Sequence, residues 1–230
     1  MDISDKKFAE TFEIVIQLAA ILSVLVLYYK RFLTGISIYI KLFVAFLPTL
    51  IVGVLAYKTI KSYLFNPFVV SFSLIIGGVV LILLDRWSEN KKTLYENTED
   101  ISLVNALKVG AIQCISMIPG VSRSAATIFG GMFAGFNRKQ AAEFSFLLAM
   151  PTMFAASAKD LWENKELITP DNVRIILFGG VTAFIVALVA VKAFVAYLTK
   201  YGFKAFGYYR IILGISFLIY ALMTGLKLQP

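Results

Sequence analysis

The sequence contains no histidine and a single cysteine, Cys114. A lone cysteine cannot form a disulfide within the chain, and without histidine there is no Cys/His cluster of the kind that binds zinc. Charge is scarce as well: Lys, Arg, Asp and Glu make up 16% of the residues, against about 25% in soluble domains. These shortages exclude a disulfide scaffold and a zinc module, and they argue against a soluble globular domain.

Hydrophobic residues, in contrast, make up 59% of the chain. Several apolar runs reach the roughly 20 residues that are needed to cross the hydrocarbon layer. The sequence therefore predicts an all-α polytopic membrane protein, with residues 1–230 forming a single integral membrane domain. About six spanning helices are expected, at about 12–28, 41–57, 67–84, 141–158, 174–198 and 207–225.

The basic residues lie at the ends of these apolar runs. The formal net charge is +8, which in a soluble protein would suggest a nucleic-acid partner. Here the basic residues form short clusters such as Lys30-Arg31 and Arg138-Lys139, a placement typical of interfacial anchors. We therefore expect the bilayer as a partner and no nucleic acid. Because the N-terminus lacks a signal-peptide pattern, the first spanning helix is expected to direct insertion.

One region departs from the pattern of long apolar runs. After a polar loop expected at 85–100, the apolar run 101–118 is interrupted by polar residues and ends at a Pro-Gly break, and a second short run follows at 125–136. The region could form two spanning helices with a tight loop, or a re-entrant pair that dips into the membrane and returns. The short second run favours the re-entrant pair.

Two pairs of segments indicate a weak internal repeat. The segment 9–22, "AETFEIVIQLAAIL", aligns with 139–152, and 65–78 aligns with 203–216. This predicts an inverted-repeat architecture, with a first repeat at about 1–84 and a second at about 101–230. The counterpart of 101–138 would fall mostly before residue 1, so the first repeat is expected to be incomplete.

The break itself carries the most informative chemistry, in "PGVSRSAAT". Pro119 and Gly120 end one helix, and Ser122, Ser124 and Thr127 lie where the next helix is expected to begin. A guanidinium at Arg123, the hydroxyls and the positive end of the second helix would converge on an anion. Among anions, phosphate fits best, because a guanidinium binds two phosphate oxygens at once.

A simpler interpretation stays open at this point. Arg123 could sit in an interfacial loop with its charge in water, while the serines only cap a helix.

Four other polar residues are candidates for a role inside the membrane: Glu13, Gln17, Gln113 and Glu143. We expect their side chains to be buried. Gln113 is a candidate substrate-binding residue, Glu13 and Glu143 are weaker candidates for acid or base catalysis, and Gln17, which would share a helix face with Glu13, is a weak candidate for the site. Hydrogen bonding between helices is the alternative role for all four.

The sequence resembles the family of undecaprenyl-diphosphate phosphatases, also known as bacitracin resistance proteins. The resemblance rests on "IQCISMIPGVSRSAATI" and "GFNRKQAAEFSFLLAMP", and it continues in "TFEIVIQLAAIL", "FNPFVVSFSLIIGG" and "FGYYRIILGI", in the same order along nearly the whole chain.

The resemblance implies a multi-pass enzyme of the bacterial inner membrane. It would remove one phosphate from undecaprenyl diphosphate, which regenerates the lipid carrier for cell-wall polymers and confers bacitracin resistance. By this resemblance Arg123 holds the diphosphate, Ser122 and Ser124 position it, and Gly120 lets the backbone approach, with Thr127 as a further substrate-binding residue. The polyprenyl diphosphate lipid is the expected partner, Mg²⁺ or Ca²⁺ is the implied cofactor, and a homodimer is left open.

The sequence departs from the family in one respect. Members usually begin with a paired-glutamate motif and a Pro-x-Ser-Ser-x-x-His stretch, and neither is present here, so no metal ligand is identifiable. A truncated gene, a misassigned start or a divergent paralogue would explain this. Two alternatives to the hydrolase therefore stay open: a protein that binds or translocates a polyprenyl phosphate without hydrolysis, and an inactive family member.

Overall fold

The computed structural model describes residues 3–33, 35–88, 92–163 and 170–224. Within these ranges every regular element is an α-helix or a 3-10 helix, which confirms the predicted all-α class. The chain divides into two compact units, one formed by Met1–Gly35 with Phe146–Ala196 and the other by Ile36–Ser145 with Tyr197–Pro230. This division does not follow the predicted repeat boundaries, and the repeat stays a prediction.

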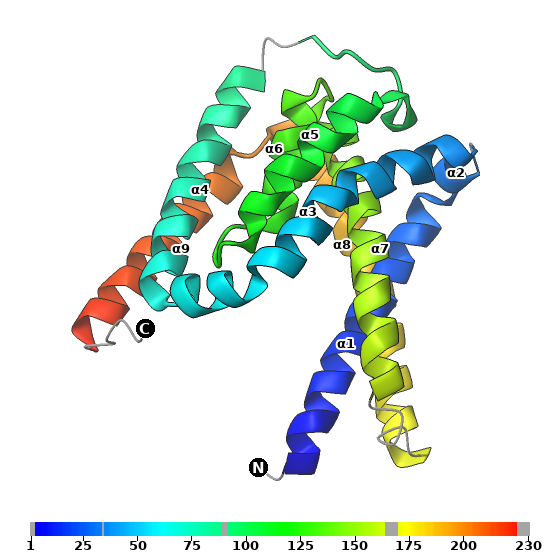
Figure 1. Cartoon of the computed structure of the whole chain (residues 1–230), viewed down its shortest axis with the longest axis vertical. Helices are drawn as coiled ribbons and strands as arrows, with labels where there is room; N and C mark the ends of the chain where they lie inside the picture. The colour runs from blue at the N-terminus through cyan, green and yellow to red at the C-terminus, as the bar shows by residue number, and fades with distance from the viewer. Residues whose placement is uncertain (1–2, 34, 89–91, 164–169, 225–230) are drawn as a thin grey trace. The chain divides into compact units, whose positions relative to one another are not determined.

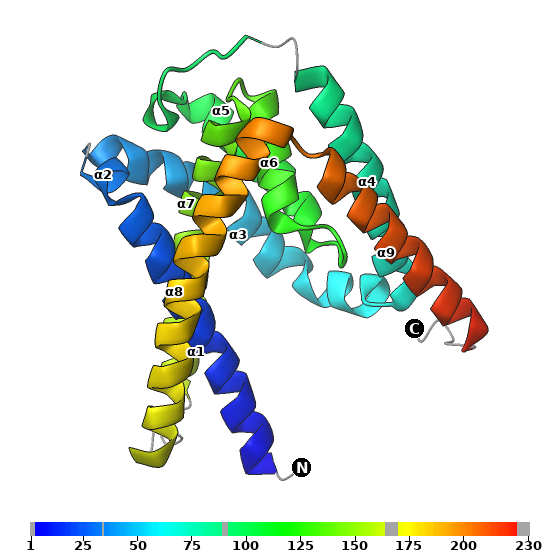
Figure 2. The same cartoon turned by 180° about the vertical axis from the view of Figure 1, so that it is seen from behind.

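The first unit contains the N-terminal helices and most of two long ones: α1 (Ile3–Leu27), α2 (Tyr29–Phe32), α7 (Arg138–Glu163) and α8 (Pro170–Tyr201). A Cβ added at Gly179 of α8 would lie 2.6 Å from the ring of Phe12, so α1 and α8 approach closely (Figure 2). Ser157 Oγ of α7 donates a hydrogen bond of 3.4 Å to the carbonyl of Ile14.

The second unit holds the break and the helices that surround it. Its elements are α3 (Ile36–Leu64), α4 (Pro67–Ser88), η1 (Thr98–Asp100), α5 (Leu103–Gln113), η2 (Cys114–Met117), α6 (Arg123–Phe133) and α9 (Lys204–Met223), together with the start of α7. Helices α4 and α9 lie side by side (Figure 1). A Cβ at Gly78 would lie 2.6 Å from the carbonyl oxygen of Gly207. Small residues thus bring these two backbones together, as is common between membrane helices.

In the described part of the chain, four helices are long and apolar enough to cross a membrane: Ile36–Ala56, Pro67–Ser88, Asn172–Tyr201 and Lys204–Met223. They correspond to four of the six expected spans. The other two expected spans also form helices, α1 and α7, but the apolar part of α1, Phe12–Leu27, is shorter.

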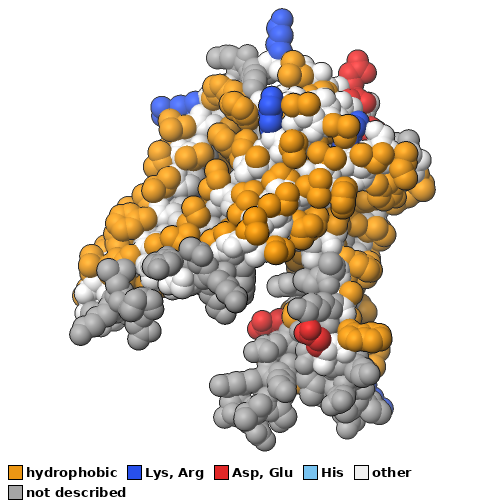
Figure 3. Space-filling model, in the orientation of Figure 1, with side chains coloured by type: hydrophobic (Ala, Val, Ile, Leu, Met, Phe, Trp, Pro, Cys, Tyr) orange, Lys and Arg blue, Asp and Glu red, His pale blue; other side chains and the backbone are white. Residues whose placement is uncertain are grey.

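Large hydrophobic side chains are exposed along these helices, for example Phe43, Leu55, Phe72 and Ile76. They cover much of the face seen in Figure 3, where most of the visible Lys and Arg side chains lie toward the top of the view. Apolar surface of this extent is suited to lipid rather than to water.

The polar loop expected at 85–100 begins later than predicted, because α4 continues to Ser88. Asp85 lies in this last turn and is only 2% exposed. Its carboxylate pairs with the guanidinium of Arg138 at 2.8 Å and accepts a hydrogen bond from the backbone N–H of Phe203 at 3.1 Å. These partners explain why a charged residue that reads as part of a loop is buried inside a helix.

Candidate active site

The Pro-Gly break separates two short helices, as the sequence predicts. Helix α5 and the 3-10 turn η2 precede the break, and α6 follows it. The two helices pack closely along their length, since a Cβ at Gly130 of α6 would lie 3.2 Å from Cα of Val109. At their outer ends, Asn105 Nδ2 donates a hydrogen bond of 3.1 Å to the carbonyl of Ala134. They therefore form a hairpin whose tip is the break.

This hairpin runs alongside α4 (Figure 1). Near the end of α4, the ring of Trp87 stacks on Phe133, the last residue of α6, with centroids 6.3 Å apart. Near the start of α4, a Cβ at Gly120 would lie 2.7 Å from the carbonyl oxygen of Val70. The tip of the hairpin thus lies beside the start of α4, whereas the end of α6 lies near the end of α4. Since α6 has 11 residues and rises about 16 Å, it is too short to span the membrane by itself.

Gly120 has the backbone conformation that the tip requires. Its φ is +87°, in the left-handed region that favours glycine. The same residue packs against α4, where a Cβ would meet Val70 and Ser73 at 3.0 Å or less. Both the turn and the close packing therefore demand a residue without a side chain.

The residues after the tip form the start of α6. Ser122 is the N-cap, and its Oγ accepts a hydrogen bond of 3.3 Å from the backbone N–H of Ala125. The hydroxyls of Ser122 and Ser124 lie 3.0 Å apart. Arg123 is the first residue of the helix, and its side chain is half-buried. The structure thus brings Ser122, Arg123 and Ser124 together at the positive end of a helix dipole, an arrangement that favours an anion.

Thr127 does not present its hydroxyl in the same way. The side chain is 1% exposed, and its Oγ1 lies 2.6 Å from Ser145 Oγ on α7. It also donates to the carbonyls of Arg123 and Ser124, one turn earlier in α6, at 3.0 and 3.1 Å. In this structure, Thr127 connects the first turn of α6 to α7.

Gln113 is buried, as expected, and lies at the end of α5. Its Nε2 donates a hydrogen bond of 2.6 Å to Thr49 Oγ1 on α3. One turn earlier, a Cβ at Gly110 would lie 2.0 Å from the carbonyl oxygen of Ala45. These contacts tie α5 to α3 behind the break.

The three remaining carboxylate and amide candidates belong to helices α1 and α7. Glu143 is 4% exposed on α7, where it accepts a hydrogen bond of 3.1 Å from Thr98 Oγ1. Its other carboxylate oxygen lies 4.0 Å from Lys139 Nζ. Glu13 and Gln17 belong to α1, and their side chains are exposed. The expectation of burial is thus confirmed for Gln113 and Glu143 and is wrong for Glu13 and Gln17.

Two functional candidates were not singled out from the sequence. Arg210 of α9 donates hydrogen bonds from one guanidinium nitrogen to the carbonyls of Gly120, at 2.8 Å, and of Ser73, at 3.3 Å. Asp85 forms the buried ion pair with Arg138 described above. The signal that could have found Arg210 is a charged residue within an apolar run, which is costly in a membrane unless it has a partner. Asp85 carries no such signal, because it follows the last residue of its apolar run.

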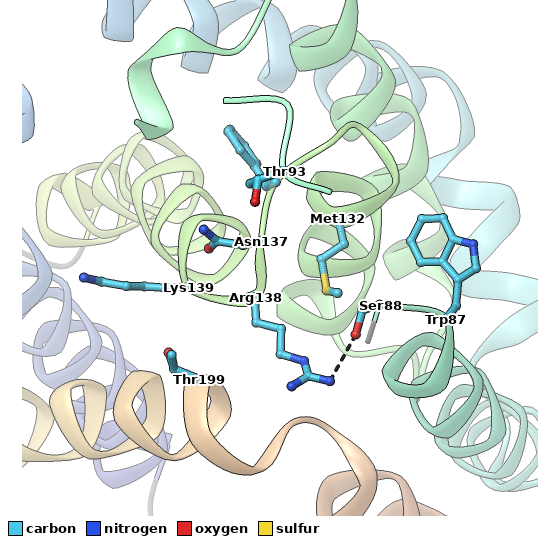
Figure 4. A pocket seen from close by; sticks show the side chains of 9 residues that line it. Trp87, Ser88, Thr93, Met132, Asn137, Arg138, Lys139 and Thr199 are labelled. Atoms are coloured by element: carbon cyan, nitrogen blue, oxygen red, sulfur yellow. Dashed lines mark hydrogen bonds between the residues drawn. The ribbon is translucent and has the colours of Figure 1, made fainter. Parts of the chain in front are cut away.

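A cavity of about 480 Å³ lies near the end of α4 and the start of α7. Figure 4 shows that Arg138 extends toward Ser88, to which it donates a hydrogen bond of 3.1 Å, and that Lys139 extends away from it. The lining residues are Trp87, Ser88, Thr93, Met132, Phe136, Asn137, Arg138, Lys139 and Thr199, and none of the predicted site residues is among them. The cavity is therefore separate from the tip of the hairpin.

The donor groups at the break suit an anion. Magnesium and calcium prefer oxygen ligands, chiefly carboxylates. Among the described residues, no three His, Cys, Asp or Glu side chains gather into a group that could hold a metal ion. The described groups at the tip, a guanidinium and hydroxyls, do not fit a divalent cation by themselves.

Comparison with known proteins gives the same family as the motif. The family model described as "Bacitracin resistance protein BacA" matches residues 1–216. The chain is 48% identical to the undecaprenyl-diphosphatase of Bdellovibrio bacteriovorus over 229 residues, which is 100% of this chain and 87% of that protein. It is 49% identical to the undecaprenyl-diphosphatase of Flavobacterium johnsoniae over 220 residues, which is 94% of this chain and 83% of that protein. The chain therefore belongs to the bacitracin resistance protein BacA family.

Proposed function

We propose that the chain is a multi-pass enzyme of the bacterial inner membrane that hydrolyses undecaprenyl diphosphate. The products are undecaprenyl phosphate and inorganic phosphate, so the reaction would recycle the carrier lipid for cell-wall polymers and confer bacitracin resistance. The observation that carries the proposal is Arg123 at the positive end of α6, beside Ser122 and Ser124. Relatives at 48 and 49% identity that are named undecaprenyl-diphosphatase support it.

In this proposal the tip of the hairpin holds the diphosphate. The guanidinium of Arg123 binds two oxygens of one phosphate, and the hydroxyls of Ser122 and Ser124 donate to others. Water attacks the terminal phosphorus, and the bond to the bridging oxygen breaks, so that this oxygen leaves with undecaprenyl phosphate. The proton that the water loses passes to the leaving oxygen or to solvent. The guanidinium and the helix dipole stabilise the negative charge that develops on the phosphate oxygens.

The remaining candidates receive supporting roles. We propose that Thr127 and Gln113 shape the substrate site indirectly, by fixing α6 to α7 and α5 to α3. Glu143 is partnered by Thr98 and Lys139. Acid or base catalysis by Glu13 or Glu143 stays a prediction, and Gln17 stays a weak candidate for the site; single replacements of the three residues test this.

The first test is phosphate release from undecaprenyl diphosphate by the purified chain in detergent. Arg123→Ala is expected to reduce kcat/KM by at least about tenfold, because hydrogen bonds to charged groups contribute about 1.5–3 kcal/mol. Arg86→Ala is the matched control, since Arg86 is an exposed arginine at the far end of α4. Equal activity of the Arg123 variant and the control would contradict the proposal.

A divalent cation is the second element of the proposed function. The family resemblance implies Mg²⁺ or Ca²⁺. Because the described groups at the tip do not fit a divalent cation by themselves, such an ion would be held chiefly by the diphosphate oxygens, whose charge it would neutralise. We expect EDTA to abolish phosphate release and either cation in excess to restore it. Full activity in EDTA would show that the chain acts without a metal. The same preparation tests whether the chain forms a homodimer, through the mass of the particle after subtraction of detergent.

Binding without hydrolysis is the second candidate function. The observation that favours it is the complete lack of histidine, since the related phosphatases usually carry a histidine motif. Binding of undecaprenyl diphosphate that depends on Arg123, without any phosphate release, would support this candidate and exclude the hydrolase.

A further inference from the structure

Arg210 lies inside a helix that is apolar enough to cross a membrane. Helix α9 contains two charged residues, Lys204 at its first position and Arg210, and the whole helix is a candidate membrane span. An arginine within such a helix is costly to place in a membrane, and residues that carry this cost are commonly functional.

The guanidinium of Arg210 reaches across α4 to the tip of the hairpin. One of its terminal nitrogens donates to the carbonyl of Gly120 at 2.8 Å and to the carbonyl of Ser73 at 3.3 Å. It passes over Gly77, where a Cβ would lie 2.6 Å from the same nitrogen. The absence of a side chain at Gly77 thus opens the path between α9 and the tip.

The carbonyl of Gly120 needs such a donor. It belongs to a turn between two helices, so no helical N–H accounts for it. A charged donor forms a stronger hydrogen bond than a neutral one. The contact therefore fixes the backbone three residues before Arg123, at the point where the chain turns toward α6.

We propose that Arg210 is a positioning residue for the anion site at Arg123, an inference that rests on the proposed function. By holding the carbonyl of Gly120, it sets the direction in which Ser122 and Arg123 enter α6. Displacement of a site by about 1 Å can lower a reaction rate by about 100-fold. Arg210 therefore contributes to substrate binding indirectly, by holding Arg123 in the position that binds the diphosphate.

Two variants remove this contact in different ways. Arg210→Met keeps a long side chain but removes the donors. Gly77→Ala leaves Arg210 in place and displaces the end of its flexible side chain, while alanine is the better residue for a helix interior. Gly180→Ala is the matched control, because its Cβ would meet nothing closer than 3.8 Å.

The experiment measures kcat, KM and the Kd for undecaprenyl diphosphate, together with the melting temperature in detergent. Arg210→Met and Gly77→Ala are each expected to raise the Kd and to lower kcat/KM by about 10- to 100-fold, with Gly180→Ala unchanged. Arg210→Lys keeps the charge and should recover part of the loss. If both variants stay within about twofold of the unmodified chain, the proposal is wrong.

A double-mutant cycle separates positioning from general destabilisation. If Arg210 acts through Arg123, then Arg210→Met has little further effect on the Kd in an Arg123→Ala background. Asp85→Asn, a change in the buried ion pair far from the tip, should instead combine additively with Arg123→Ala. Additive effects of Arg210→Met would overturn the proposal. Because the cycle measures the Kd for the lipid, it tests the proposal even if the chain releases no phosphate and the proposed hydrolysis is wrong.

Discussion

Gly120 shows how much a single residue contributes to the candidate site. Its φ of +87° sets the turn, its Cα packs onto α4 beside Val70, and its carbonyl accepts the hydrogen bond from Arg210. The first two properties require glycine, because a Cβ is strained at this φ and would collide with the carbonyl of Val70. The residue thus connects backbone conformation directly to the placement of Arg123.

We predict that Gly120→Ala lowers both stability and activity. A residue held in an unfavourable backbone region costs about 1–3 kcal/mol, and relief of the contact with Val70 would move the tip. The melting temperature in detergent and the rate of phosphate release are the measurements, with Gly180→Ala as the control. A melting temperature equal to that of the control would argue against the described turn.

At the scale of the elements, Asp85 connects three helices. Its carboxylate pairs with Arg138 at the start of α7 and accepts the N–H of Phe203 before α9. Gly202 lies against it, since a Cβ at that position would be 2.1 Å from Oδ1 of Asp85. One buried carboxylate therefore joins the end of α4 to the starts of two other helices.

Replacement of Asp85 by asparagine is expected to destabilise this junction. Removal of one partner of a buried ion pair costs about 3–5 kcal/mol, because the other charge is left without compensation. Arg138 is 22% exposed on its side chain, so we expect a loss at or below the lower end of this range. Chemical or thermal unfolding would measure it, with the exposed Glu96→Gln as the control. Equal unfolding midpoints for the two variants would show that the ion pair adds no stability.

At the scale of the whole molecule, the orientation of the hairpin determines which membrane face the site opens toward. The tip lies near Val70, within the first turns of α4, whereas Trp87 at the other end of α4 stacks on the last residue of α6. The diphosphate would then reach Arg123 from the membrane face at which α4 begins.

Cysteine labelling tests this direction. In a Cys114→Ala background, we predict that Val121→Cys and Phe65→Cys react with an impermeant maleimide from the same side of sealed vesicles. Glu96→Cys and Lys139→Cys are expected to react from the opposite side, because α4 with its 22 residues rises about 33 Å and spans the bilayer. Labelling of Val121→Cys from the side of Glu96 would contradict the depth of the hairpin.

The sequence by itself determined the helices and the break, and it predicted which residues bind the anion. Apolar runs define helices that cross a membrane, and a cap such as that of Ser122 on Ala125 joins residues only three positions apart. Both features depend on residues that are close in the sequence, so they can be predicted from the sequence alone. The motif around Arg123 likewise lies within a few consecutive residues, and it was sufficient to predict the family.

Only the tertiary structure decided which polar residues support that motif. The contacts of Arg210 with Gly120 and Ser73 join residues 90 and 137 positions apart. Asp85 reads as the first residue of a polar loop, and the structure buries it because Arg138 and Phe203 supply partners. Glu13 and Gln17 read as buried, but their side chains are exposed. Burial and pairing depend on which helix faces meet, and packing between distant segments leaves no periodic trace in the sequence of either one.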